Sequence, residues 1–177
     1  MEKTLKTEII YKGKKVLFQR DEVELESGRK TIRELTIHPG SAAIIPMLPD
    51  SRIIIIKQYR YAVKNTLYEI PAGTLEPGET PLQCAHRELK EETGYTAGKM
   101  EKLIQFYPSP GISNELMHLF LAKDLKKAGR GGSRTALSDE TLAVLEVNMD
   151  EAIEMIKNGK IIDAKTICGI LLCSKDL

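Results

Sequence analysis

Four consecutive isoleucines at positions 53–56 constrain the fold more strongly than any other feature of this sequence. A strand turns successive side chains to opposite faces, so an unbroken apolar run needs cover on both faces of its sheet. We therefore predict a central strand over residues 52–59. A second apolar strand is expected over residues 42–47, with residues 48–51 forming the hairpin turn between the two.

The rest of the chain contains several short strand patterns and two helix patterns near its end. Strands are expected over residues 7–11, 16–24, 31–38, 67–70, 102–106, 116–122 and 141–147. Helices are expected over residues 150–158 and in a segment capped by Asp163. A length of 177 residues suits one compact unit, with an N-terminal antiparallel β subdomain over residues 1–40 and a larger domain over residues 41–177.

The most clearly marked helix is predicted over residues 80–93. Thr80 is an N-cap residue and Gln83 lies three positions later, which is the spacing of a capping box. Pro81 occupies the first helical position, where its missing N–H is not needed. Gly94 is the expected end of the helix because glycine adopts the left-handed conformation that closes many helices.

Three glutamates crowd the C-terminal end of this helix. Glu88 and Glu92 are four residues apart and share one face, while Glu91 lies about 100° away from Glu92. Like charges repel, and acids at this end oppose the helix dipole, so a hard divalent cation would relieve the arrangement. The alternative is a solvated acidic face in which Arg87 pairs with Glu91 and Lys90 serves as a counter-charge.

The nearly equal numbers of acidic and basic residues exclude a strong long-range electrostatic field of one sign. Lysine plus arginine number 26 and aspartate plus glutamate number 25, so neither nucleic acid nor an anionic membrane is an expected partner. The N-terminus lacks the apolar core of a secretory signal. The three cysteines, Cys84, Cys168 and Cys173, have no metal-type spacing and are odd in number, which favours reduced residues and a cytoplasmic protein.

Residues 73–95 resemble the Nudix box, Gly-x5-Glu-x7-Arg-Glu-U-x-Glu-Glu-x-Gly-U, where U is a bulky aliphatic residue. The matching positions are Gly73, Glu79, Arg87, Glu88, Leu89, Glu91, Glu92 and Gly94. Tyr95 departs from the pattern, at what we interpret as a packing position. Eight fixed positions at set spacings form a far more specific signal than a single glycine motif.

The resemblance implies a Nudix fold, which is an α+β fold with an α/β/α sandwich, a mixed central sheet and an N-terminal antiparallel sheet. It also implies an Mg²⁺ site, with Mn²⁺ as an alternative cation. The implied metal ligands are the carbonyl of Ala72 and the side chains of Glu88, Glu91 and Glu92. Glu91 and Arg87 are implied catalytic groups, with Arg87 acting as a structural ion-pair partner and Glu79 lying near the metals. Such cations neutralise a diphosphate and activate a water molecule as nucleophile.

Similarity continues outside the box, to the ADP-ribose pyrophosphatase branch of the family. Its marker is Pro110, in the loop after the box. The resemblance implies hydrolysis of ADP-ribose to AMP and ribose 5-phosphate. The implied substrate contacts are Arg60, Glu69, Gly111, Ser113 and Glu115. The alternatives are a surface charge at Arg60, a type II turn at Pro110 and Gly111, and a strand-edge residue at Glu115.

Two further site predictions depend on weaker patterns. Members of this branch take a glutamate from a loop after the box as catalytic base, which implies Glu140, with Asp139 as second choice and Ser138 in a position that is often acidic. Arg33 and Glu34 resemble purine-contacting residues of the branch, since a guanidinium can stack on adenine and a carboxylate can accept from its amino group. The alternatives are a solvated loop and an exposed strand face.

Members of the branch are typically homodimers that exchange the N-terminal sheet, which implies a homodimer here and site residues from the partner. The substrate itself remains open. Another nucleoside diphosphate sugar such as a GDP-sugar, or a dinucleotide such as NADH, fits the same box. A non-catalytic ADP-ribose sensor is the alternative of a different class, although a pure binder gains little from three crowded glutamates.

Overall fold

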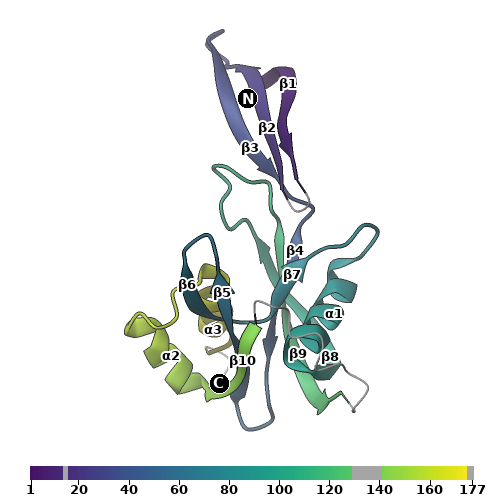
Figure 1. Ribbon diagram of the computed structural model, residues 1–177, viewed down its shortest axis with the longest axis vertical. Coiled ribbons are helices and arrows are strands. Elements are labelled where there is room, and N and C mark those ends of the chain that lie inside the picture. The colour runs from purple at the N-terminus through teal and green to yellow at the C-terminus, as the bar shows by residue number, and fades with distance from the viewer. Residues whose placement is uncertain (14–15, 129–140, 175–177) are drawn as a thin grey trace. The chain divides into compact units, whose positions relative to one another are not determined.

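A computed structural model of the chain describes residues 1–13, 16–128 and 141–174 (Figure 1). It divides into two compact units. The first comprises Met1–Gly40 and Phe106–Leu116, and the second comprises Ser41–Gln105 and Met117–Leu177.

The first unit is built on a three-stranded antiparallel sheet. Its strands are β1 (Lys3–Lys12), β2 (Leu17–Glu24) and β3 (Lys30–Ile37), paired in that order. Residues 106–116 belong to this unit because their backbone bonds to β3. The Thr36 N–H donates to the Ile112 carbonyl at 2.7 Å. Every residue of β1 is exposed, including the apolar Ile9, Ile10 and Tyr11.

The second unit contains two sheets. The four-stranded sheet has the order β7 (Ala72–Thr74), β4 (Ser41–Pro46), β9 (Met117–Lys127), β8 (Tyr95–Phe106). It is mixed, since β4 pairs antiparallel with β7 and parallel with β9. The three-stranded antiparallel sheet has the order β10 (Thr141–Asn148), β5 (Arg52–Arg60), β6 (Asn65–Glu69).

The isoleucine run lies on β5, the middle strand of the second sheet, and all four side chains are 0% exposed. The predicted central strand is therefore confirmed. The predicted hairpin between residues 42–47 and 52–59 is wrong, because β4 and β5 belong to different sheets and share only a bridge between Met47 and Ile53. β9 takes one hydrogen-bonding edge of β4 along Ser41–Pro46 and β7 takes the other edge at Ser41–Ala43, and β5 pairs with the chain only after β4 has ended, at Met47.

Helices cover both faces of β4. Helix α1 (Pro81–Thr93) packs with Leu89 in a buried cluster that includes Ile44. Helix α3 (Ala164–Cys173) packs so closely that a side chain on Gly169 would meet Ile45. Because neighbouring residues of a strand face opposite ways, α1 and α3 lie on opposite sides of this strand. Helix α2 (Met149–Lys157) follows β10 (Figure 1).

The predicted ends of α1 are confirmed. Thr80 and Gln83 form both bonds of the capping box, and Gly94 closes the helix at a φ of 74°. The α+β class, the mixed sheet and the N-terminal antiparallel sheet are confirmed as well. Within the described residues, no helix combines the length and the apolar character needed to cross a membrane.

Candidate active site

The loop between β7 and α1 presses its backbone against the helix that follows. A side chain on Gly73 would overlap the carboxylate of Glu88, so only glycine allows this approach. Gly78 has a φ of 81°, which lets the loop reverse before the helix. The Glu76 N–H then donates to the Glu79 carboxylate at 3.0 Å. The two loop glycines therefore place the acids of the loop and the helix beside one another.

Arg87 is the centre of an ion-pair cluster on α1. Its Nε and Nη2 both donate to Glu79 at 2.8 Å, and its Nη1 donates to Glu88 at 2.5 Å and to Glu91 at 3.3 Å. The bidentate Arg87 guanidinium lowers the pKa of Glu79 to about 2. One guanidinium thus serves three carboxylates. The pairing of Arg87 with Glu91, considered above as the non-functional alternative, is present alongside the others.

Glu92 lies deeper than the other acids, at 7% exposure. Its Oε2 accepts a hydrogen bond from the Ala72 N–H at 2.9 Å. Burial raises the pKa of Glu92 to about 7, and the charge of Glu88 adds to the rise, while the Ala72 N–H opposes it. Burial also raises the pKa of Glu88. Both shifts mean that this end of α1 holds more negative charge than its surroundings stabilise.

The same groups are chemically suited to a divalent cation. Carboxylate and carbonyl oxygens are the ligands that Mg²⁺ prefers, and Glu88, Glu92 and the Ala72 backbone are linked through the contacts above. Among the side chains that the structure describes, no three acids, histidines or cysteines converge as a ready-made metal site. A cation held here therefore needs backbone, water or substrate oxygens as further ligands, which is common for Mg²⁺.

A second charged cluster joins β5, β6 and the start of α3. Arg60 forms a fork on Glu69, with Nε–Oε1 and Nη2–Oε2 distances of 2.7 and 2.6 Å. Lys165 donates to the same carboxylate and, at 3.0 Å, to Asp163. Glu69 is only 1% exposed, so both cations act on a fully buried anion. Burial alone would raise the pKa of Glu69, but the hydrogen bonds and charges of Arg60 and Lys165 outweigh it, so the pKa of Glu69 is lowered.

Lys165 was not among the residues that the sequence suggested. The sequence predicts Asp163 as a helix cap, and its carboxylate accepts from the Thr166 N–H at 3.0 Å. Lys165, two positions later, has the sequence context of an ordinary charged residue in the first turn of a helix. Nothing in its neighbourhood along the chain reveals that it reaches a glutamate 96 positions away.

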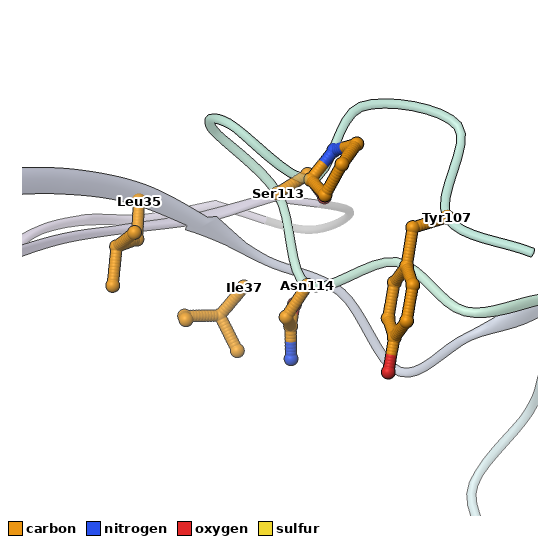
Figure 2. Close-up of a pocket in the computed structure, with 6 residues that line it drawn as sticks. Leu35, Ile37, Tyr107, Ser113 and Asn114 are labelled. Carbon is orange, nitrogen blue, oxygen red and sulfur yellow. The ribbon is translucent and has the colours of Figure 1, made fainter. Parts of the chain in front are cut away.

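The predicted residues Ser113, Gly111 and Glu115 lie in the first unit. That unit contains a pocket of about 300 Å³, lined by Leu35, Ile37, Tyr107, Pro110, Ser113 and Asn114. Figure 2 shows the side chains of Leu35 and Ile37 from β3 projecting to the same side as those of Tyr107 and Asn114 from the loop. Ser113 Oγ accepts from the Glu115 N–H at 3.1 Å.

Gly111 is exposed and its φ is not in the left-handed region, so the residue does not act as the second position of a type II turn. The marker residue Pro110 therefore contributes to a pocket wall in a loop of different geometry.

The other predicted residues fall in two places. Arg33 donates to Glu2 through Nε at 3.0 Å and Nη2 at 2.6 Å, at the exposed surface of the first unit. Glu34 is exposed on the same strand, in register with Arg20. The predicted base Glu140, together with Asp139 and Ser138, lies outside the described residues.

Comparisons with known proteins agree on one family. A model of the NUDIX domain matches residues 37–168. The chain is 43% identical over 169 residues to the methanol dehydrogenase activator of Bacillus methanolicus, covering 96% of this chain and 90% of that protein. It is 41% identical over 169 residues to the ADP-ribose pyrophosphatase of Bacillus subtilis (strain 168), with the same coverage. The crystal structure of an ADP compounds hydrolase shares the fold, with a TM-score of 0.83 at 20% identity over 98% of this chain and 92% of that one.

Proposed function

The chain belongs to the NUDIX family, and on that premise we propose that it is an ADP-ribose diphosphatase. It would hydrolyse the diphosphate bond of ADP-ribose to AMP and ribose 5-phosphate. The observation that carries this proposal is the buried carboxylate of Glu92, which holds the Ala72 N–H, together with the half-buried carboxylate of Glu88 against Gly73. The 41% identity to an ADP-ribose pyrophosphatase supports the choice of substrate.

The proposed metal is Mg²⁺, with Mn²⁺ as a substitute, since a divalent cation is a general need of this family. Glu88, Glu92 and the carbonyl of Ala72 would hold it, with Glu91 at the exposed edge of the cluster. When bound, the cation would neutralise diphosphate charge and lower the pKa of a water molecule. Arg87 positions the acids, because each of its donor nitrogens is already bonded to Glu79, Glu88 or Glu91.

Glu140 is the proposed catalytic base, with Asp139 as second choice. Glu140→Gln should lower kcat strongly and leave KM for ADP-ribose broadly unchanged, because the change removes a proton acceptor and leaves the substrate contacts in place. Steady-state kinetics with Asp139→Asn as the matched variant would separate the two carboxylates. Wild-type turnover by both variants would move the base to a glutamate of α1.

Arg60 is the proposed contact to the diphosphate. Glu69 occupies its Nε and Nη2, which leaves Nη1 as the donor for a ligand oxygen. Gly111, Ser113 and Glu115 remain proposed substrate contacts, and Arg33 and Glu34 remain proposed purine contacts. The buried Glu69 is proposed to act on substrate through Arg60.

We also propose a cytoplasmic homodimer formed through the N-terminal sheet. Ile9 and Tyr11 on β1 are 57% and 62% exposed, and apolar side chains in such a row favour burial against a partner. Light scattering should give the mass of a dimer, and Ile9→Lys should give a monomer. A monomeric wild-type protein would contradict the dimer without affecting the proposed reaction.

Product analysis tests the reaction directly. The purified protein is incubated in the presence of Mg²⁺ with one of three substrates, ADP-ribose, a GDP-sugar or NADH, in separate reactions. The products are identified by chromatography. AMP and ribose 5-phosphate from ADP-ribose at the highest kcat/KM would support the proposal. Preference for another compound would assign a different substrate to the same site. ADP-ribose binding without turnover would make the protein a sensor.

A further inference from the structure

Lys165 is a buried cation that the proposed reaction does not use. Its side chain is 10% exposed, although lysine is rarely buried unless it is paired. Its ammonium group donates to Glu69 and to Asp163. Burying three charged groups in this way is costly compared with an apolar contact, so packing alone does not account for the cluster.

The first turn of α3 fixes Glu69 at two points. Lys165 binds the carboxylate, and Thr166 Oγ1 accepts from the N–H of Ile70, the next residue after Glu69, at 2.9 Å. Thr166 is itself 0% exposed and is held by Asp163. The side chain of Glu69 and the backbone that follows it are therefore both held by the first turn of α3.

Glu69 in turn sets the direction of Arg60. The fork uses both carboxylate oxygens, so the plane of the guanidinium follows the plane of the carboxylate. The side chain of Arg60 is 36% exposed and that of Glu69 is 1% exposed, so the carboxylate is the buried end of the pair. The third bond, from Lys165 to Oε2, anchors this buried end.

Lys165 also affects how strongly Arg60 attracts an anion. With Lys165 present, two cations face Glu69, although Lys165 shares its charge with Asp163, whose carboxylate also accepts from the Thr166 N–H at the N-terminus of α3. Without it, Arg60 would be the sole counter-charge of a buried carboxylate, which would cancel much of its attraction for a diphosphate.

We propose that Lys165 is a positioning residue for substrate binding, which holds Glu69 so that Arg60 presents Nη1 to an anionic ligand. This inference rests on the proposed function, in which Arg60 contacts the diphosphate. It predicts that changes at Lys165 alter substrate affinity more than the chemical step.

The kinetic test compares Lys165→Met with Lys165→Arg and with Lys157→Met. Lys157 is an exposed lysine on α2 whose ion-pair partner among the described residues is Glu154, so it controls for loss of a lysine elsewhere. With saturating Mg²⁺, Lys165→Met should raise KM for ADP-ribose about tenfold and change kcat less than about threefold. Lys165→Arg should recover most of the affinity. A fall in kcat with unchanged KM would overturn the proposal.

A double-mutant cycle tests the route through Glu69. If Lys165 acts through this carboxylate, Lys165→Met combined with Glu69→Gln should raise KM no further than Glu69→Gln alone. Additive increases in KM would contradict it. Should Lys165→Met fail to fold by circular dichroism, Lys165→Gln, which keeps a donor group, takes its place in the same cycle.

A spectroscopic measurement separates this inference from the proposed reaction. The Nε–H of Arg60 donates to Glu69, so its nitrogen-15 resonance reports the fork in the protein without substrate. Lys165→Met should shift or broaden that resonance, whereas Lys157→Met should not. An unchanged resonance overturns the positioning role even if ADP-ribose is hydrolysed. A changed resonance in a protein that does not hydrolyse ADP-ribose would leave the positioning role standing and reject the reaction.

Discussion

Two charged clusters of the second unit differ in their ratio of acids to cations. At the C-terminal half of α1, the single guanidinium of Arg87 serves three carboxylates. The cationic cluster at the start of α3 has two cations, Arg60 and Lys165, for the two carboxylates of Glu69 and Asp163. The first cluster lacks positive charge, which a divalent cation can supply. The second leaves a donor nitrogen of Arg60 for an anion. A metal-dependent diphosphate hydrolase needs both kinds of cluster, and this chain builds each by a different stoichiometry of the same residue types.

The largest expected effect concerns the excess negative charge at α1. Glu92→Gln keeps an acceptor for the Ala72 N–H and removes the charge, so kcat/KM at low Mg²⁺ should fall by about 100-fold or more. A magnesium titration of activity measures the change. Lys90→Gln, an exposed change on the same helix, should leave the titration unaltered. An unaltered titration for Glu92→Gln itself would remove Glu92 from the metal ligands.

The same variant should be more stable without metal. A carboxyl group whose pKa rises from 4.5 to about 7 on folding stabilises the fold while protonated, and that contribution is lost as the pH rises through this range. At pH 8 in a chelator, Glu92→Gln should therefore melt at a higher temperature than the wild type. The gain in unfolding free energy should be at most about 3 kcal/mol. A lower melting temperature would mean that the charge is already compensated.

Removing the shared cation of the acidic cluster should be the next largest change. Arg87→Met leaves Glu79, Glu88 and Glu91 without their common partner, so the free energy of unfolding should fall by about 2 kcal/mol. Denaturant unfolding without divalent cations measures it, and added Mg²⁺ should restore part of the loss. Arg20→Met, which breaks an exposed pair with Glu8, should shift the midpoint less. Equal shifts of the unfolding midpoint for Arg87→Met and Arg20→Met would show that the Arg87 cluster contributes no more to stability than an exposed ion pair.

A smaller effect is expected at the cationic cluster. Arg60→Met should raise KM for ADP-ribose about tenfold with little change in kcat, because the proposed contact to the diphosphate would be lost from the ground state and the transition state alike. Lys64→Met removes a neighbouring charge from the exposed turn after β5 and should leave KM unchanged. If Arg60→Met lowered kcat alone, the arginine would act on the transition state.

The smallest predicted effect is a pH dependence. The pKa of Glu79 is lowered from 4.5 to about 2 by Arg87, so its ion pair stabilises the fold above pH 4.5 and is lost as the pH falls toward 2. Solvent screening makes the contribution modest. The difference in melting temperature between wild type and Glu79→Gln should shrink over this range. A constant difference would show that Glu79 contributes through shape alone.

The two clusters also differ in how far the sequence could predict them. All residues of the acidic cluster lie between Gly73 and Gly94, where a capped helix fixes which glutamates share a face, so the local pattern was sufficient. The cationic cluster depends on Glu69 meeting Lys165 across 96 positions, and no local pattern encodes that contact. The misassigned hairpin at residues 48–51 has the same origin. Residues 48–51 do form a turn, in which the Ser51 N–H donates to the Leu48 carbonyl at 3.1 Å, but the partners of β4 come from distant strands.

Two peptide N–H groups between β6 and β7 donate to side chains of the helices that carry these clusters. The Ala72 N–H is held by Glu92, and the Ile70 N–H is held by Thr166. Both amides donate to side chains instead of to neighbouring strands. Their hydrogen-exchange rates therefore depend on the position of α1 and of α3, respectively. Slowing at position 72 on addition of Mg²⁺ would follow the helix that carries the acids, while the rate at position 70 would follow the helix that carries Lys165. Deuterium uptake at residues 72 and 70 would therefore report cation binding at the acidic cluster and the intactness of the cluster around Glu69 and Lys165, respectively.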